Sequence, residues 1–294
     1  MPRVETNGIQ VEYDTFGDRS ARPLLLVMGL GGQMIMWDEE FCEQLADCGH
    51  FVVRFDNRDI GFSTQFDEHG PPDMAAMMAA FAGGEAPPSA YTLDDMADDA
   101  AGLIEALELE AAHVCGASMG GMIAQTLAIR YPRRVKSLVS IMSTTGEPEL
   151  PGPSPEAMSI LVGPPPQTRE EAIERGVKLW SVIGSPGFPF DEERTRERAG
   201  RFYDRANHPE GQARQLAAIV SHGSRREALT RLDVPTLVIH GAADPLVPVA
   251  GGRDTAAAIP GAELLVVEGM GHDLPPGAWP TIVPAIERHT QAAG

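Results

Sequence analysis

The sequence predicts an α/β fold in which helices flank a mostly parallel central sheet. Short apolar runs alternate with segments of helical periodicity through the first 142 residues, and such alternation is typical of parallel strands joined by crossover helices. The alternation stops between residues 151 and 231, where helical patterns and turn clusters occur without a convincing strand, and it resumes at residue 234. A chain of 294 residues is long enough for one large domain with an insertion.

The first elements follow in a regular order. Residues 9–16 alternate apolar and polar side chains, which predicts a half-exposed strand. The continuous apolar run 24–28 predicts a strand buried on both faces, and a similar run at 51–55 predicts the next strand. Helical spacing at 37–48 separates these two strands.

A capping pattern predicts the next helix. Thr92 is followed three residues later by Asp95, as in a capping box with Asp in place of the usual Glu. This helix should run to about Leu109. The apolar residues 113–115 then predict a strand, and helical spacing from Met122 predicts the helix that follows it.

The second half of the chain predicts three more strands, at 135–142, 234–240 and 263–267, and a closing helix at about 279–289. The proline-rich segment 151–166 is typical of a linker into an insertion. We therefore predict two parts, listed by residue number: a core formed by 1–146 and 232–294, and a helical cap formed by 147–231.

The composition is that of an ordinary globular protein, with 43% hydrophobic and 22% charged residues. The net charge of −19 argues against nucleic-acid binding, which needs a basic face. The longest apolar run is too short to cross a bilayer, and residues 1–17 lack a basic-then-apolar leader pattern. Three cysteines, an odd count without metal-ligand spacing, favour a reducing compartment. We expect a cytoplasmic protein that does not bind membranes or a metal.

The run Gly116-Ala117-Ser118-Met119-Gly120 fits a nucleophile elbow between a strand and a helix. A serine at such a sharp turn adopts a strained backbone, so the residues two before and two after it must be small. The helix N-terminus behind the serine offers free N–H groups that suit a developing oxyanion. Ser118 is the candidate nucleophile.

A serine nucleophile needs a histidine base and a carboxylate that orients it. Both should follow late strands, because catalytic groups of parallel sheets gather at the carboxyl ends of strands. Asp244 follows the strand at 234–240 and is the candidate acid, although an ordinary Asp-Pro turn is the plainer interpretation. Glu147, after the strand at 135–142, is its main competitor. His272 lies in a glycine-rich loop after the strand at 263–267 and is the candidate base.

The oxyanion hole needs two backbone N–H groups. One should come from Met119, the residue after the nucleophile, and the other from Leu30 in the glycine-rich loop that follows the buried strand at 24–28. The charged run 56–63 follows another strand end. We expect it to form a structural ion-pair network in which Asp56 and Asp59 pair with Arg58.

Together these residues resemble the α/β-hydrolase superfamily. The matching segments are Met28–Gly32, 56–63, Gly116–Gly121, Asp244 and Gly271-His272. Within it, the chain is similar to bacterial carboxylesterases of the aclacinomycin methylesterase type, which share the Leu-Leu-Leu-Val-Met-Gly opening and the Gly-Met-Gly-His ending.

The resemblance implies a serine hydrolase that cleaves small-molecule carboxylic esters through an acyl-enzyme, with no metal or organic cofactor. The same triad also serves lactone hydrolysis, carbon–carbon bond cleavage and cofactor-free peroxide chemistry, so these stay as alternatives. A ligand receptor that keeps the fold is the alternative from another class. The oligomeric state is left open.

The substrate pocket should be mostly apolar. Cap aromatic residues and an apolar stripe with helical spacing suggest a lining around the nucleophile. Because we expect no free cation beside the site, neutral and moderately hydrophobic esters should be favoured over anionic ones. The candidate lining residues are Gly29, Met78, Phe81, Trp180, Phe188 and Phe202.

Overall fold

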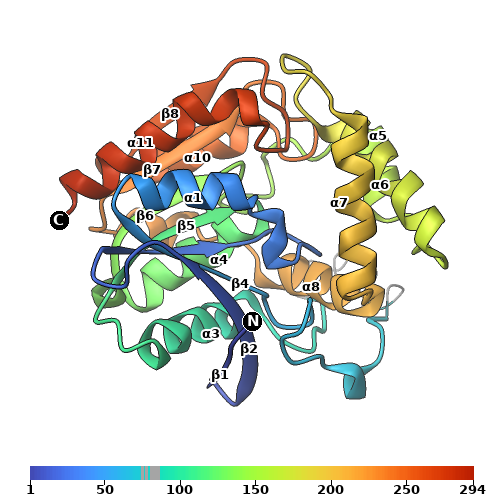
Figure 1. Ribbon diagram of the computed structural model, residues 1–294, viewed down its shortest axis with the longest axis horizontal. Coiled ribbons are helices and arrows are strands. Elements are labelled where there is room, and N and C mark those ends of the chain that lie inside the picture. Colours follow the sequence, from blue (N-terminus) through green and yellow to red (C-terminus); the bar gives the residue numbers. More distant parts are fainter. Residues whose placement is uncertain (74–75, 77–78, 80–86) are drawn as a thin grey trace.

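The computed structural model describes residues 1–73, 76, 79 and 87–294. It confirms the α/β fold: an eight-stranded sheet has the order β1-β2-β4-β3-β5-β6-β7-β8 (Figure 1). The strands β3 to β8 run parallel, and only the pairings of β2 with β1 and with β4 are antiparallel. The strands are β1 Arg3–Thr6, β2 Ile9–Phe16, β3 Arg22–Val27, β4 His50–Phe55, β5 Ala112–Ala117, β6 Val135–Ile141, β7 Thr236–Gly241 and β8 Glu263–Val267.

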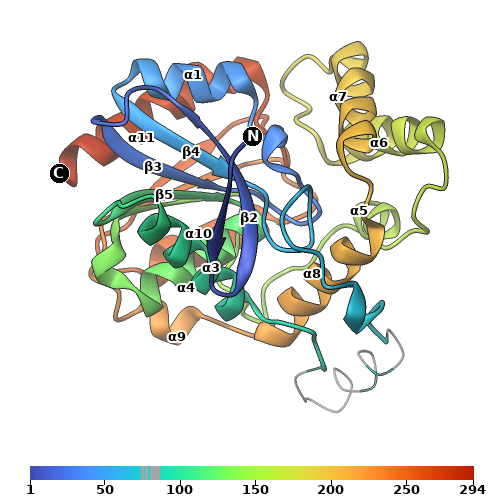
Figure 2. The ribbon, with the colours of Figure 1, turned by 60° about the horizontal axis from the view of Figure 1, so that its bottom comes forward.

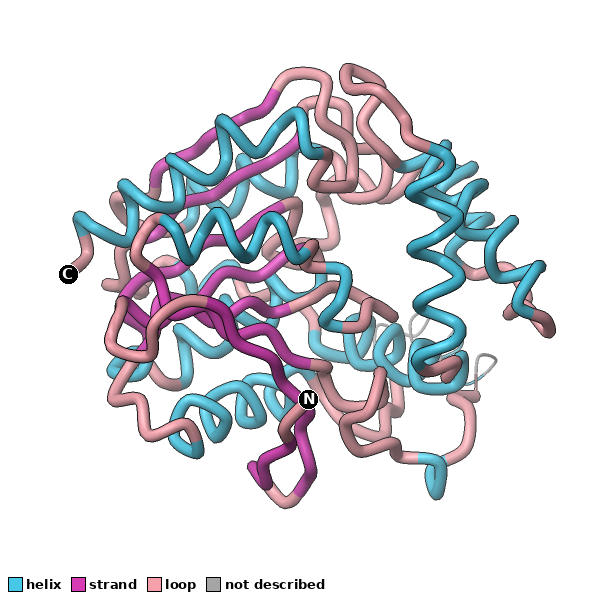
Figure 3. Tube along the Cα trace, viewed as in Figure 1, coloured by secondary structure: helices cyan, strands magenta, loops and turns pink. Residues whose placement is uncertain are grey.

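Helices cover both faces of the sheet, and the tube in Figure 3 shows the strands enclosed between them. On one face lie α1 (Glu39–Asp47) and α11 (Trp279–Ala292), and on the other lie α3 (Leu93–Ala106), α4 (Met119–Arg130) and α10 (Val249–Ala258) (Figure 2). Short 3₁₀ helices occupy Met34–Met36, Asp67–His69, Pro132–Arg134 and Pro276–Ala278.

The alternation of side chains in β3 creates two separate cores. Leu24 and Leu26 pack among residues of α1 and α11, whereas Leu25 and Val27 pack among residues of α3 and α4. All four side chains are buried. A continuous apolar run is required in such a strand because neither face meets water.

The predicted capping box is present at the start of α3. The Thr92 side chain accepts from the Asp95 backbone N–H, and the Asp95 carboxylate accepts from the Thr92 N–H at 2.7 Å. The helix ends at Ala106, slightly earlier than the sequence pattern predicts.

Between β6 and β7 the fully described chain forms only helices. They are α5 Pro155–Leu161, α6 Arg169–Ile183, α7 Glu192–Arg205, α8 Pro209–His222 and α9 Arg226–Leu229. We call α5 to α8 the cap; α5, α6 and α7 group beside one end of the sheet (Figure 1). The short helix α9 instead packs on α4 and α10. Boundaries of the cap at residues 147 and 231 stay a prediction. Among the described residues, no helix is both long and apolar enough to span a membrane.

Buried ion pairs attach the cap to the core. Arg205 of α7 binds the Asp56 carboxylate at 2.7 Å, and Arg214 of α8 binds Asp59 through two contacts of 2.8 Å. The predicted ion-pair network therefore exists, but the predicted pairing was wrong. Arg58 binds Asp99 of α3 at 2.6 and 2.7 Å instead.

The pairing differs because the segment 56–63 lies between the cap and α3. Its two aspartates contact cations of the cap, which the sequence places about 150 residues away. Its arginine contacts the carboxylate of α3, and both members of that pair are buried. Neighbours in sequence need not be partners in such a loop.

Candidate active site

The nucleophile elbow has the backbone geometry that the sequence predicts. Ser118 joins β5 to α4 with φ 57° and ψ −121°, a strained conformation for a residue with a side chain. A Cβ at Gly116 would lie 2.0 Å from the Gly120 carbonyl oxygen, and a Cβ at Gly120 would lie 2.0 Å from that of Val27. Glycine is therefore required at both positions.

Two further hydrogen bonds hold the strained serine. Its backbone N–H donates to the Ile141 carbonyl at 2.9 Å, and the Ser143 hydroxyl donates to its carbonyl at 2.8 Å. Both partners come from β6 or the residues just after it. The neighbouring strand thus fixes the direction of the Ser118 side chain.

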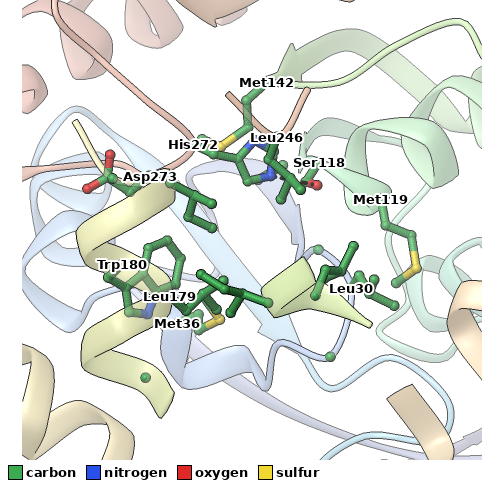
Figure 4. A pocket seen from close by; sticks show the side chains of 18 of the residues that line it. Leu30, Met36, Ser118, Met119, Met142, Leu179, Trp180, Leu246, His272 and Asp273 are labelled. Carbon is green, nitrogen blue, oxygen red and sulfur yellow. Dashed lines mark hydrogen bonds between the residues drawn. The ribbon is translucent and has the colours of Figure 1, made fainter. Parts of the chain in front are cut away.

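The three candidate triad side chains form one continuous hydrogen-bonded line. His272 Nε2 lies 3.0 Å from Ser118 Oγ (Figure 4). On the other side of the ring, His272 Nδ1 lies 2.7 Å from Asp244 Oδ2. His272 and Asp244 are each only 6% exposed. This arrangement allows the histidine to accept the serine proton while the buried carboxylate stabilises the resulting positive charge.

Backbone groups hold the Asp244 carboxylate in place. Its Oδ1 accepts from the N–H groups of Leu246 and Val247, both at 2.9 Å, which leaves Oδ2 directed at His272. The competing acid, Glu147, is placed elsewhere: its carboxylate accepts from the Ser224 hydroxyl and has no contact with His272 among the described residues.

The cap contacts the histidine loop directly. The His272 N–H donates to the Ile183 carbonyl at the end of α6 at 2.7 Å, and the Gly271 N–H donates to Ser185 Oγ at 2.8 Å. The cap therefore positions the backbone of the candidate base as well as covering the site.

The glycine-rich loop after β3 lies against Ser118. A Cβ at Gly29 would be 3.1 Å from Ser118 Cβ, a tight contact that would push the loop away from Ser118 by a few tenths of an ångström. The Leu30 N–H donates to no acceptor among the described residues. Met119 is the first residue of α4, and its N–H can have no acceptor within the helix. Both predicted oxyanion donors are thus free for a ligand.

A cavity of about 1900 Å³ lies between the cap and the core, with Ser118 and His272 in its lining. Figure 4 shows Leu30 and Met119 on one side of this space and Trp180 of α6 on the other. The predicted residues Gly29, Trp180, Phe188 and Phe202 also line it, and their contact with substrate stays a prediction. Met78 and Phe81 lie outside the described residues.

Two charged side chains of the cavity wall, one next to the candidate base and one beside Trp180, escaped the sequence analysis. Asp273, next to the candidate base, accepts from the Ser185 hydroxyl, and burial raises the pKa of its carboxyl group. Arg198 of α7 lies with its guanidinium 4.9 Å from the Trp180 ring centroid, and burial lowers its pKa. The wall of the cavity is therefore mostly apolar but carries charged side chains of both signs. Besides Asp273 and Arg198 these are Asp38, Glu147, Arg175, Asp191, Arg194 and Glu210.

Of these two residues, only Asp273 had a sequence signal, its position directly after His272. Arg198 is one of five arginines in α7, and on an amphipathic helix most of these face water. In the part of the chain that the structure describes, no group of three or more His, Cys, Asp or Glu side chains is arranged to hold a metal ion.

Comparisons with known proteins agree on one family. The sequence model of the α/β hydrolase fold family matches residues 22–275 of this chain. A rhodomycin D methylesterase of Streptomyces sp. (strain C5) is 33% identical over 94% of this chain and 93% of its own length. The rhodomycin D methylesterase of Streptomyces peucetius is 32% identical over 100% of this chain and 99% of its own length. The solved structure of a meta-cleavage product hydrolase from Pseudomonas fluorescens IP01 matches with a TM-score of 0.77 and covers 100% of this chain and 98% of its own. At 20% sequence identity this is a likeness of fold alone.

Proposed function

We propose, on the premise that the chain belongs to the α/β-hydrolase family, that Ser118, His272 and Asp244 are the residues with which it hydrolyses esters. The chain is a serine hydrolase of carboxylic esters. The observation that carries the assignment of residues is the hydrogen-bonded line from Ser118 Oγ through His272 to Asp244.

In the first half of the reaction, Ser118 Oγ attacks the ester carbonyl carbon while His272 Nε2 takes its proton. The N–H groups of Leu30 and Met119 stabilise the negative oxygen of the tetrahedral intermediate. When that intermediate collapses, the alcohol leaves with the proton from His272, and the acyl group stays on Ser118. Water activated by His272 then attacks the acyl-enzyme and releases the carboxylic acid.

We propose further that the natural substrates are methyl esters of bulky, largely apolar carboxylic acids. The cavity of about 1900 Å³ exceeds the ~300–1000 Å³ of ordinary small-molecule pockets. Most of its wall is apolar, including Met36, Met142 and Leu179. The relatives named as rhodomycin D methylesterases support the choice of a methyl leaving group.

A panel of methyl esters tests this substrate class, with acids that range from acetic acid to fused aromatic carboxylic acids and with lactones of matched size beside them. We expect steady turnover that rises with the size of the acid part, because a larger apolar acid buries more surface in the cavity. Faster turnover of the lactones would favour lactonase activity. A single burst without turnover would favour a receptor.

We expect neutral esters to be preferred to anionic ones in spite of Arg198. Asp273 already supplies a negative charge to the same part of the cavity, so a substrate carboxylate would be desolvated near a like charge. A neutral diester should have kcat/KM at least about tenfold higher than its half-ester, a difference of ~1.4 kcal/mol.

The test variant is Arg198→Gln. Its control is Arg201→Gln, on the exposed side of the same helix. Neither should change the ratio of kcat/KM between the two substrates by more than about threefold. Equal or better kcat/KM for the half-ester that falls in Arg198→Gln alone would instead identify Arg198 as a binding residue for anions.

We also propose that the enzyme acts in the cytoplasm. Its partners are small-molecule substrates, and it does not bind nucleic acids. Its three cysteines are free, as a reducing compartment would keep them. Its net charge of −19 opposes association with a phosphate backbone.

A further inference from the structure

A glutamine of the cap contacts the loop that carries the Leu30 N–H. Gln215 of α8 is fully buried, its Oε1 accepts from the Gly31 N–H at 2.9 Å, and its Nε2 donates to the Arg58 carbonyl at 2.8 Å. We propose that Gln215 is a positioning residue that fixes the oxyanion hole from the cap. This inference rests on the proposed role of Leu30 as an oxyanion donor.

The peptide planes around Leu30 show how this works. The Gly29 carbonyl accepts from the Gly32 N–H at 3.1 Å. Because the Gly29 carbonyl and the Leu30 N–H point in opposite directions from one planar peptide, this bond also sets the direction of the N–H. The next peptide, between Leu30 and Gly31, is held by Gln215. Leu30 is therefore constrained from both sides.

The core holds the loop at one further point. The Asn57 side chain donates to the Met28 carbonyl at 2.8 Å, which fixes the start of the loop. Among the described residues, the side chain of Gln215 is the sole hydrogen-bond acceptor for the Gly31 N–H. Loss of Gln215 would leave that side of Leu30 without its constraint.

Such a constraint matters because the loop is rich in glycine. Gly29 approaches Ser118 so closely that an added Cβ would lie 3.1 Å from Ser118 Cβ, and Gly31 has φ +67°, which favours glycine. Glycines give the free loop many alternative conformations. An oxyanion donor works when it is held in place before the reaction, so an external hydrogen bond replaces the rigidity that the loop sequence lacks.

The helix that carries Gln215 is itself anchored next to it. Arg214 binds Asp59 at 2.8 Å through two nitrogens, and both side chains are buried. Burial opposes ionisation of Asp59, but the hydrogen bonds from Arg214, the Phe66 N–H and Tyr91, together with the charge of Arg214, outweigh it and lower the pKa of the carboxyl group. A Cβ at Gly211 would meet the Asp59 carbonyl at 2.1 Å, so α8 also packs closely on this loop. The position of the Gln215 amide is thus fixed relative to the core.

The two hydrogen bonds also fix the orientation of the amide. The Gly31 N–H needs an acceptor and the Arg58 carbonyl needs a donor, so the oxygen and nitrogen of Gln215 cannot be exchanged. A methionine at this position would keep the approximate volume and lose both bonds. A glutamic acid would keep both bonds when protonated, and when ionised it would lose the donor to Arg58.

The first test compares Gln215→Met with the wild-type enzyme on a neutral methyl ester. We expect kcat to fall by about 10- to 100-fold and KM to stay within about threefold, because the loss concerns a donor that acts mainly in the transition state. The affinity for a trifluoromethyl ketone, which forms a tetrahedral adduct with Ser118, should fall by about the same factor as kcat. The affinity for the matched methyl ketone should not.

The matched control is Gln33→Met. Gln33 is also a buried glutamine that joins cap and core, since its amide donates to the Phe202 and Ala206 carbonyls at 2.8 Å. These carbonyls lie at the end of α7, and within the described chain Gln33 makes no hydrogen bond to the peptides on either side of Leu30. We expect a comparable loss of thermal stability and a change in kcat of less than about threefold.

A second variant, Gln215→Glu, gives a pH readout that a merely structural residue would not produce. The introduced carboxyl group is buried, which favours its protonated form and both native hydrogen bonds. As pH rises, the group ionises and repels the Arg58 carbonyl. The ratio of its kcat to that of the wild-type enzyme should therefore fall with increasing pH.

The outcomes separate this inference from the proposed function. If Gln215→Met keeps wild-type kcat and ketone affinity while Ser118→Ala is inactive, the positioning role is overturned and the proposed function stands. If Gln215→Met does not fold, a flat kcat ratio for Gln215→Glu across pH overturns it instead. If the wild-type enzyme shows no turnover that depends on Ser118, the proposed function itself fails.

Discussion

Ser118→Ala is expected to abolish ester hydrolysis while leaving the fold intact. The substitution removes the attacking oxygen and its 3.0 Å contact with His272, and any remaining rate is limited to what the oxyanion hole and binding supply. The side chain is small and only half-buried, so the midpoint of thermal unfolding should shift by no more than about 4 °C. Steady-state turnover and a thermal melt measure both effects.

The matched control for this prediction is Ser143→Ala. Its hydroxyl contacts the Ser118 carbonyl rather than the candidate base. Its loss should lower kcat by less than about tenfold, an effect of under ~1.4 kcal/mol. A purified Ser118→Ala enzyme that kept more than a small fraction of the wild-type rate would show that another group is the nucleophile.

Asp244→Asn is expected to lower kcat by about 10³- to 10⁴-fold. An amide nitrogen in place of Oδ2 would donate to His272 Nδ1, so the histidine would carry its proton on Nε2 and could not accept the serine proton. The N–H groups of Leu246 and Val247 hold the Asp244 side chain and would hold the amide oxygen equally. The positions of the three side chains should therefore be kept, while His272 has the wrong tautomer to act as a base.

Glu147→Gln is the comparison for that prediction. Its carboxylate contacts Ser224 away from the candidate base, so kcat should change by less than about tenfold. A large loss in Glu147→Gln together with a small loss in Asp244→Asn would place the acid after β6 and refute the assignment of Asp244.

The arrangement of the candidate catalytic residues could be predicted from sequence because each of its parts depends on local structure or on sheet topology. The small residues around Ser118 are needed wherever a strand turns sharply into a helix, so the elbow is visible in five residues. The strands β5, β7 and β8 are parallel, and their carboxyl ends meet at one edge of the sheet. A histidine and an aspartate that follow late strands could therefore be matched to the serine.

The contacts between cap and core could not be predicted in this way. Asp56 and Asp59 bind arginines of α7 and α8, whose place in space depends on how a long helical insertion folds back. Arg198 and Gln215 lie on helices with many polar residues, and no pattern distinguishes a buried polar side chain from a solvated one. The sequence analysis therefore missed the polar residues of the cavity wall and of the cap interface.

Covalent labelling during turnover tests the central claim most directly. The wild-type enzyme would be quenched with acid within the first turnovers of an activated p-nitrophenyl ester and analysed by intact-mass and peptide mass spectrometry. We predict the addition of one acyl group, on the peptide that contains Ser118, and no addition in Ser118→Ala. An acyl group on any other residue would contradict the account. So would full turnover, under conditions where deacylation limits the rate, by an enzyme that carries no acyl group.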